Sequence, residues 1–118
     1  MTAELAVIIV SWNTCTLTLD AIRTLQDDLD ANGPDAEIWV VDNASTDGTP
    51  DAIRSEFPKV NIIESTTNLG FAGGNNHALR VIGFQTDATV TNADLPLAAY
   101  LLNSDTRTQP GATRALYD

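Results

Sequence analysis

Three apolar runs, at 5–10, 38–41 and 98–102, organise this chain. Each run is continuous rather than alternating, which is typical of a parallel strand that is covered on both faces. Each ends abruptly in polar residues: Ser11 and Asn13 after the first, Asp42 and Asn43 after the second, and Asn103, Ser104 and Asp105 after the third. Because parallel strands present their carboxyl ends at one edge of a sheet, we expect these polar groups to line one ligand crevice.

Helical patterns lie between the runs. Apolar residues recur at helical spacing over 17–29, and the polar residues just before that stretch offer an N-cap. Thr49 as a cap, with Pro50 at the first helical position, predicts a short helix that runs to about Phe57. The candidate caps of the first helix are Asn13, Thr14 and Thr16.

The second half of the chain continues the alternation. The run at 60–64 predicts a further strand, and a helix that carries Ala78 and Leu79 follows the polar, glycine-rich loop expected at 66–76. The stretch 83–96 fits either a loop or a short hairpin, and 109–112 has the composition of a helix start. Strands that alternate with helices predict an α/β domain with a mainly parallel sheet flanked by helices.

The composition limits the partners. With 118 residues the chain fits one domain, and its 16 acidic and 6 basic side chains give a formal charge of −10. Such a surface repels polyanions, so we expect no nucleic-acid partner. A diphosphate ligand would have to be held by backbone amides, helix N-termini or a divalent cation rather than by basic side chains alone.

Targeting signals and disulfides are not expected. The single Cys15 cannot form an internal disulfide, suits a reducing compartment and has the surroundings of a small packing residue. No apolar run approaches the length of a membrane span, and no basic region opens the chain as in a signal peptide. We therefore expect a cytoplasmic protein.

The aspartates after the second and third runs are the best ligand candidates. A carboxylate at Asp42 can accept hydrogen bonds from a base or a ribose, although an aspartate there can also cap its own loop. The matching positions of Ser11 and Asp105 favour the ligand interpretation. Asp105 is the candidate metal ligand, because Mg²⁺ and Mn²⁺ prefer hard oxygen ligands and are often held by one or two carboxylates plus substrate phosphates. The residues 45–47 are expected to shape a turn rather than to contact ligand.

A glycine cluster, Gly70, Gly73 and Gly74, could let the backbone approach a phosphate at a helix N-terminus. Its spacing matches neither the dinucleotide fingerprint nor the P-loop, so the cluster alone is weak evidence. Asn68 and Asn75 flank it with amide groups that suit sugar hydroxyls or phosphate oxygens.

Four segments in this order resemble the large inverting family of GT-A glycosyltransferases, family 2, especially its rhamnosyltransferase-like members. They are VIIVSWN at 7–13, VVDNASTDGT at 40–49, NLGFAGGN at 68–75 and LLNSDT at 101–106. The resemblance implies a Rossmann-like GT-A fold that binds a nucleotide-diphospho-sugar. It also implies an inverting enzyme that moves a sugar, from dTDP-rhamnose or a UDP-sugar, to a glycan or lipid-linked acceptor in polysaccharide assembly.

The same resemblance assigns roles to residues. It implies that Ser11 and Asp42 hold the base and ribose, and that the 68–75 segment, with Gly70 and Phe71, lines the donor pocket. Asn103-Ser104-Asp105 takes the place of the family's Asp-X-Asp motif, in which the last aspartate binds Mn²⁺ or Mg²⁺ on the diphosphate. Asn103 is a weaker metal ligand than the aspartate usual at its position.

Full members of that family are longer, so we expect 1–118 to be the N-terminal donor-binding part, inactive alone, with the catalytic base further along the chain. Apolar surface left uncovered would favour a homo-oligomer, and the whole protein would sit in the cytoplasm, peripherally at the inner face of the membrane. Two alternatives remain: a nucleotide-sugar-binding module without catalysis, and a nucleotidyltransferase. The latter normally has a glycine-rich stretch with a basic residue near its N-terminus, and none follows Val10.

Overall fold

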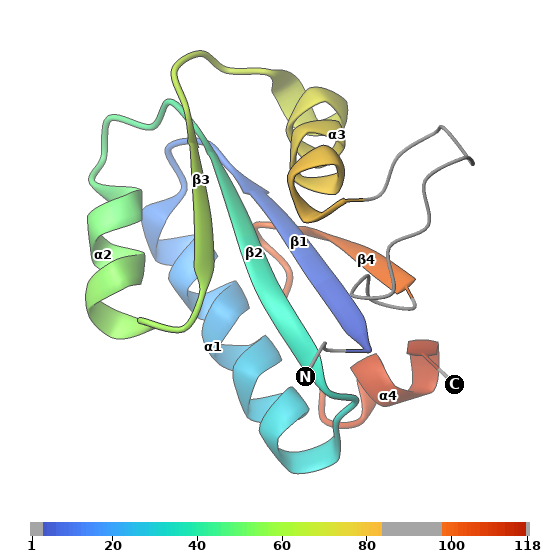
Figure 1. Ribbon diagram of the computed structural model, residues 1–118. Helices are drawn as coiled ribbons and strands as arrows, with labels where there is room; N and C mark the ends of the chain where they lie inside the picture. Colours follow the sequence, from blue (N-terminus) through green and yellow to red (C-terminus); the bar gives the residue numbers. More distant parts are fainter. Residues whose placement is uncertain (1–3, 84–97, 118) are drawn as a thin grey trace, which may run out of the picture.

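The computed structural model describes residues 4–83 and 98–117. In these two ranges strands and helices alternate along the chain (Figure 1). The strands are β1 (Leu5–Ser11), β2 (Ala36–Asn43), β3 (Asn61–Ser65) and β4 (Ala98–Asn103). The helices are α1 (Cys15–Asn32), α2 (Thr49–Glu56), α3 (Gly70–Ile82) and α4 (Ala112–Tyr117). The unassigned stretch 83–96 lies outside the described residues beyond Gly83.

The strands form a parallel sheet in the order β3-β2-β1-β4. In this register Ser11 lies opposite Asp42, and Val10 lies opposite Asn103. The parallel α/β architecture expected from the continuous apolar runs is therefore confirmed, and the polar residues that end β1, β2 and β4 lie at one edge of the sheet.

Helices cover both faces of the sheet. On one face α1 and α2 pack Ile22, Leu25 and Ile53 against Val7, Ile9 and other strand residues, and all of these side chains are buried. On the other face α3 packs Ala78 against Ile8 and Val41. Figure 1 shows α3 on the face opposite α1 and α2. The full burial of β1 between the two layers explains why its sequence is apolar at every position from Leu5 to Ile9.

The helix starts differ from the expectations. At α1, Thr14 holds the N-cap position without a side-chain cap bond, and the first helical amide, Cys15 N–H, donates instead to Asp47 Oδ2 (3.0 Å). At α2, Thr49 is already helical and the preceding residue is Gly48 in the left-handed region (φ 78°). Asp47 supplies the acceptor in both places: for the Cys15 N–H of α1 from another loop, and for the Thr49 N–H of α2 (3.3 Å) from the residue before Gly48.

The glycine-rich segment is also corrected. It was expected to remain a loop as far as residue 76, but α3 begins at Gly70. Gly74 therefore lies inside the helix, where a Cβ atom would come within 2.9 Å of the Val10 Cγ1 atom. The glycine at this position allows α3 to approach β1 closely.

Candidate functional site

The candidate site is the carboxyl edge of the sheet, where the loops after β1, β2 and β4 meet. Ser11 and Asp42 are register partners at this edge. The Thr14 hydroxyl donates to Ser104 Oγ (3.3 Å) and so joins the loop after β1 to the turn after β4. Because β1 lies between β2 and β4, the ends of β2 and β4 are two strand spacings apart, about 10 Å. The edge therefore brings together segments that are far apart in sequence.

Ser11 lies on the inner side of this edge. Its side chain is fully buried, and its hydroxyl shares hydrogen bonds with Thr18 Oγ1 (2.8 Å) and Thr14 Oγ1 (3.3 Å). Thr14 and Thr18 are also bonded to each other (3.1 Å). The three hydroxyls bind the end of β1 to the first turn of α1.

Asp42 has a different environment, although it is only 3% exposed. Its Oδ2 atom accepts a hydrogen bond from the Ser45 N–H (3.0 Å), while its Oδ1 atom is buried and has no partner among the described residues. A buried carboxylate oxygen without a donor is costly, so such an atom marks a place where a ligand or a water donor is stabilising.

The loops after β1 and β2 are held together by reciprocal hydrogen bonds. Asn13, in the left-handed region (φ 50°), accepts the Thr46 N–H at its Oδ1 (2.8 Å) and donates its own N–H to Ser45 Oγ (2.9 Å). Asp47 accepts from Cys15 N–H and from the Thr49 hydroxyl, and the latter bond lowers the pKa of Asp47. The residues 45–47 therefore shape and fix this double loop, as expected from their composition.

A second set of polar side chains lies at this edge, on the face of the sheet that α3 covers. Asn43 donates from Nδ2 to Gly70 O (3.1 Å), and Asn75 donates from Nδ2 to Phe71 O (3.0 Å). The Oδ1 atoms of both asparagines and the hydroxyl of Ser65 are buried without partners in the described ranges. Ser65 was not among the sequence candidates, although it too is a polar residue at the end of a strand and pairs with Asn43 in register.

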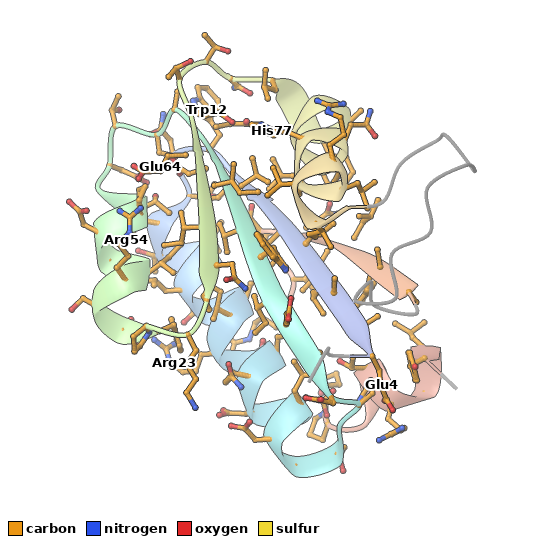
Figure 2. The ribbon with its side chains drawn as sticks, in the orientation of Figure 1. Glu4, Trp12, Arg23, Arg54, Glu64 and His77 are labelled. Atoms are coloured by element: carbon orange, nitrogen blue, oxygen red, sulfur yellow. The ribbon has the colours of Figure 1, made fainter. Side chains whose placement is uncertain are left out.

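The start of α3 lies at the same edge. Asn68 accepts the Gly70 N–H at its Oδ1 (2.8 Å), which fixes the turn into the helix. Phe71 in the first turn is 51% exposed, and Trp12 beside Ser11 is 54% exposed. In Figure 2 Trp12 and His77 of α3 lie toward the same end of the molecule. The edge thus presents aromatic surface as well as polar atoms.

The Asp105 turn follows β4. Asn103 and Asp105 are exposed, and the Thr106 N–H donates to Asn103 O (3.1 Å) to close the turn. No group of three or more histidine, cysteine, aspartate or glutamate side chains in the described ranges could hold a metal ion. A single exposed carboxylate fits a cation that is bound mainly through ligand phosphates, with Asp105 and Asn103 as the protein's oxygen donors.

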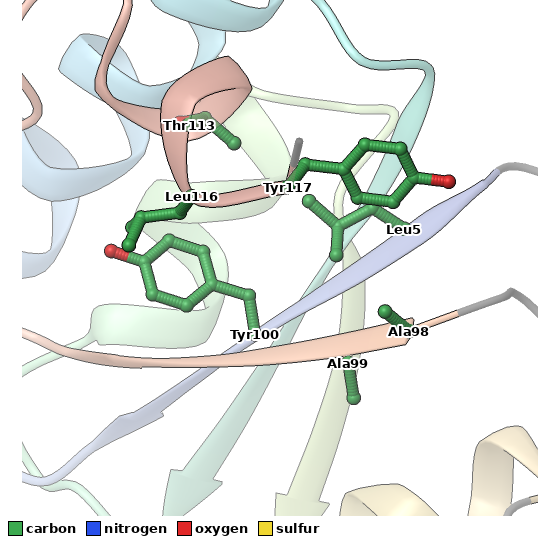
Figure 3. Close-up of a pocket in the computed structure, with 7 residues that line it drawn as sticks. All are labelled: Leu5, Ala98, Ala99, Tyr100, Thr113, Leu116 and Tyr117. Carbon is green, nitrogen blue, oxygen red and sulfur yellow. The ribbon is translucent and has the colours of Figure 1, made fainter.

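A separate groove is lined by none of the candidate site residues. It has a volume of about 550 Å³, lies between β4 and α4, and is mostly apolar (Figure 3). Leu5 and Ala98, the first residues of β1 and β4, line it together with Tyr100, Leu116 and Tyr117. It is therefore at the amino end of the strands, opposite the candidate site.

The geometry defines a class before any comparison: a Rossmann-like parallel α/β domain whose functional groups cluster at the carboxyl edge. Residues 6–88 match the family model described as "Glycosyl transferase family 2". The chain belongs to this family. A comparison with curated protein sequences found no match.

Several solved structures are also similar to this chain. The mannosyltransferase PcManGT from Pyrobaculum calidifontis, in complex with GDP-Man and Mn²⁺, is 31% identical over 69% of this chain and 25% of its own length, with a TM-score of 0.58. S. aureus TarS 1-349 in complex with UDP superposes on 97% of this chain with a TM-score of 0.72 at 18% identity, which shows the fold alone. The chain spans 31% of that structure. The fold is thus that of the GT-A glycosyltransferases, as the sequence resemblance implied. No helix in the described ranges is long and apolar enough to cross a membrane.

Proposed function

We propose that this chain binds the nucleoside diphosphate part of a sugar donor along the carboxyl edge of its sheet. The observation that carries the proposal is the buried Asp42 Oδ1 atom, which has no partner among residues 4–83 and 98–117 and lies where the ends of β1, β2 and β4 meet. A base N–H or a ribose hydroxyl would supply the missing donor. Family membership supports this assignment, as do the complexes of PcManGT with GDP-Man, a sugar donor, and of TarS with UDP, a nucleoside diphosphate.

The other polar groups are assigned around that contact. Asn43 and Asn75 present amide oxygens on the α3 face that have no partner in the described part of the chain and suit hydroxyl donors of the ligand. Ser11 at the end of β1 and Asn13 in the loop after it shape the wall of the site. Asn68, Gly70, Phe71 and Gly74 form the α3 side of the donor pocket in this proposal.

The diphosphate is assigned to the Asp105 side of the edge. With a formal charge of −10, the chain needs a positive counter-charge there. Asp105 and Asn103 would hold Mn²⁺ or Mg²⁺ with the phosphates, and Ser104 would line the same turn. When bound, such a cation stabilises the charge that develops on the leaving nucleoside diphosphate. The presence of Mn²⁺ in the PcManGT complex supports this choice of cofactor.

In the whole protein the proposed reaction is transfer of the sugar, with inversion, to a glycan or lipid-linked acceptor in polysaccharide assembly. The acceptor hydroxyl then needs a base to take its proton, and we assign that role to no residue of this edge. The rhamnosyltransferase-like sequence pattern supports dTDP-rhamnose or a UDP-sugar as donor. A cytoplasmic location, with peripheral attachment at the inner face of the membrane, and self-association belong to the same proposal.

Calorimetric titration with UDP, dTDP and GDP, each with and without Mn²⁺, tests the binding proposal. We expect at least one nucleotide to bind, more tightly with Mn²⁺ than without it. Asp105→Ala should abolish the gain from Mn²⁺ and should not weaken metal-free binding, because it removes a negative charge beside the diphosphate. Asp51→Ala is the matched control, because Asp51 is an exposed carboxylate on α2 outside the site. Absence of binding for all three nucleotides would overturn the proposal.

A further inference from the structure

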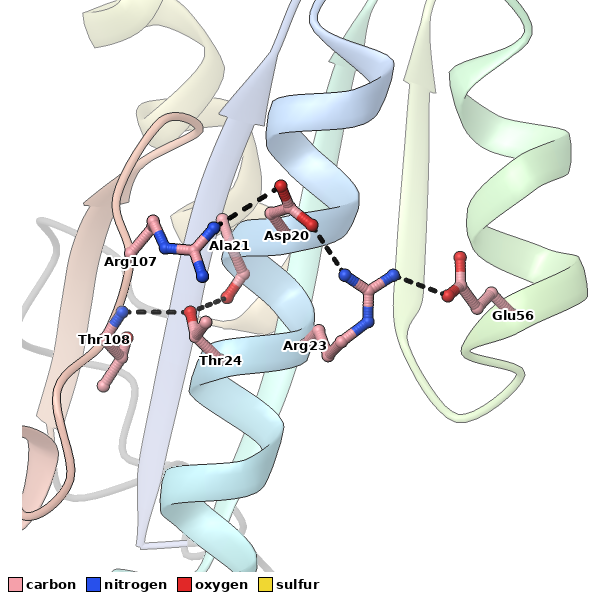
Figure 4. Close-up of polar contacts among 7 residues, drawn as sticks. All are labelled: Asp20, Ala21, Arg23, Thr24, Glu56, Arg107 and Thr108. Atoms are coloured by element: carbon pink, nitrogen blue, oxygen red, sulfur yellow. Dashed lines mark hydrogen bonds and ion pairs between the residues drawn. The ribbon is translucent and has the colours of Figure 1, made fainter.

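Four polar residues recur at every fourth position along α1, and each of them contacts the chain after β4. We call them the α1 polar row: Asp20, Thr24, Asp28 and Asn32. Their partners, residues 107–114, form the return segment. Arg107 pairs with Asp20 (3.6 Å), Thr108 N–H donates to Thr24 Oγ1 (2.9 Å), Gly111 and Thr113 N–H donate to Asp28, and Arg114 Nε donates to Asn32 O (3.1 Å). Figure 4 shows the first two of these contacts.

Asp28 makes the strongest contact in the row. It is 4% exposed, and its Oδ1 accepts the Gly111 N–H (2.6 Å) while its Oδ2 accepts the Thr113 N–H (3.1 Å). Asn32 Nδ2 donates to the same Oδ1 atom (3.0 Å). Because Gly111 precedes α4 and has no side chain, Asp28 supplies the cap of that helix from α1. Burial alone would raise the pKa of Asp28, but these donors outweigh burial and lower it.

Hydrogen bonds and one ion pair join the return segment to α1. A cavity of about 210 Å³ remains between α1 and this segment, lined by Thr24, Asp27, Asp28 and Pro110 among others. The position of the return segment therefore depends on the polar row.

The Asp105 turn lies between two anchors on α1. On one side Ser104 Oγ accepts from Thr14, which directly precedes α1, and on the other side Thr108 N–H is held by Thr24. Both anchors are joined by one continuous helix of 18 residues. Loss of the downstream anchor would give the turn more conformations, and the ordering of those residues would then oppose metal binding.

We propose that Asp28 is a positioning residue: by fixing the return segment on α1, it sets the place of Asp105 for the metal-bound diphosphate. This inference rests on the proposed function. It predicts that Asp28 acts on the metal-dependent part of binding and not on the metal-free contact at Asp42.

The test compares Asp28→Asn with Asp27→Asn, which removes the same charge from the adjacent, exposed residue. Each variant is titrated, with and without Mn²⁺, with the nucleoside diphosphate that the unaltered protein binds most tightly among UDP, dTDP and GDP. We expect Asp28→Asn to weaken binding in Mn²⁺ by about tenfold, as for other groups that orient metal ligands, and to leave metal-free binding unchanged. Asp27→Asn should change neither. Amide hydrogen exchange at Gly111 and Thr113 should be faster in Asp28→Asn alone.

Two results would overturn the inference: unchanged Mn²⁺-dependent affinity in Asp28→Asn, or an equal loss with and without Mn²⁺. If the unaltered protein bound none of the nucleotides, the proposed function itself would have failed. Should Asp28→Asn not fold, Thr24→Val serves in its place, because it removes the acceptor of the Thr108 N–H while keeping the side-chain shape. The same selective loss in Mn²⁺ is then expected.

Discussion

Ser11 and Asp42 are register partners at the ends of β1 and β2, yet their polar atoms have opposite surroundings. The Ser11 hydroxyl is bonded to Thr14 and Thr18 inside the protein, whereas Asp42 retains a buried oxygen without a partner in the described ranges. One residue is therefore expected to serve stability and the other to serve binding.

Substitution separates these two roles. Asp42→Asn should lower nucleotide affinity by about tenfold, because a hydrogen bond to a charged acceptor is worth about 1.5–3 kcal/mol, and should change the unfolding free energy little. Ser11→Ala should lower the unfolding free energy by about 1–2 kcal/mol by disrupting the buried hydroxyl group, with unchanged affinity. Urea unfolding and calorimetric titration of both variants check this. If only Ser11→Ala lost affinity, the ligand contact would be made by Ser11 and not by Asp42.

A substitution at Asn103 should change the affinity for a nucleoside diphosphate in opposite directions with and without Mn²⁺. Asn103→Asp adds a second carboxylate next to Asp105, so the Mn²⁺-dependent affinity for a nucleoside diphosphate should rise on the order of tenfold, since ligand charge tunes the affinity of such sites. Without metal the new charge repels the diphosphate, and affinity should fall. Titration of this variant in Mn²⁺ and in chelator measures both. Equal changes in the two conditions would show that residue 103 does not contact the metal.

Gly74→Ala tests the packing of α3 on the sheet. The new Cβ would lie 2.9 Å and 3.0 Å from the two Val10 methyl carbons, and Val10 is a stiff, branched side chain held in β1. Overpacking of this kind costs about 1–3 kcal/mol, and the gain in helix propensity, about 1 kcal/mol, offsets only part of it. We expect a lower unfolding midpoint in urea, partly restored by Val10→Ala in the double variant. A more stable Gly74→Ala protein would contradict the close approach.

The two aspartates that cap helices from a distance should make the protein acid-sensitive. The pKa values of Asp28 and Asp47 are both lowered in the folded protein from an ordinary value of 3.8. Their contribution to stability is therefore complete above about pH 4 and is lost as the pH falls through the lowered values. Asp28→Asn should be less stable than the unaltered protein at neutral pH, and the difference between them should shrink below about pH 4. Thermal unfolding across this range measures it, with Asp27→Asn as the control that keeps the full acid dependence.

The sheet was predictable because its signal is local. Continuous apolar runs of the length of a strand, each followed by polar residues, need no knowledge of the rest of the chain, and Leu5 to Ile9 is buried as such a run requires. The helix starts were predicted less well. Thr49 was expected to cap α2, but Gly48 holds that position and Asp47, just before it, accepts the Thr49 N–H. A loop was expected where α3 begins at Gly70, because glycine has low helix propensity. At α1 the acceptor for the first helical amide comes from Asp47 in another loop, and such a contact leaves no trace in the sequence beside the helix.

Asp28, which lies outside the candidate site, shows the same limit. Its place in a helix of mixed composition gave it no special weight, although the spacing of four between Asp20, Thr24, Asp28 and Asn32 was visible as a polar row. Only the path of the chain after β4 shows that this row has partners. Ser65 was likewise visible as a polar strand end, but its pairing with Asn43 is a property of the sheet register.

The sequence by itself determined the alternation of strands and helices, the parallel sheet, the family and the set of polar residues at strand ends, because these depend on periodicity and on short segments. The tertiary structure decided which of those polar groups are already bonded to other described residues and which, like Asp42 Oδ1, are not. It also decided which aspartates cap helices far from them in the chain. Those outcomes depend on contacts between segments that are 32 to 90 residues apart in the chain, such as Asn13 with Ser45 and Thr14 with Ser104. No local sequence pattern encodes such contacts.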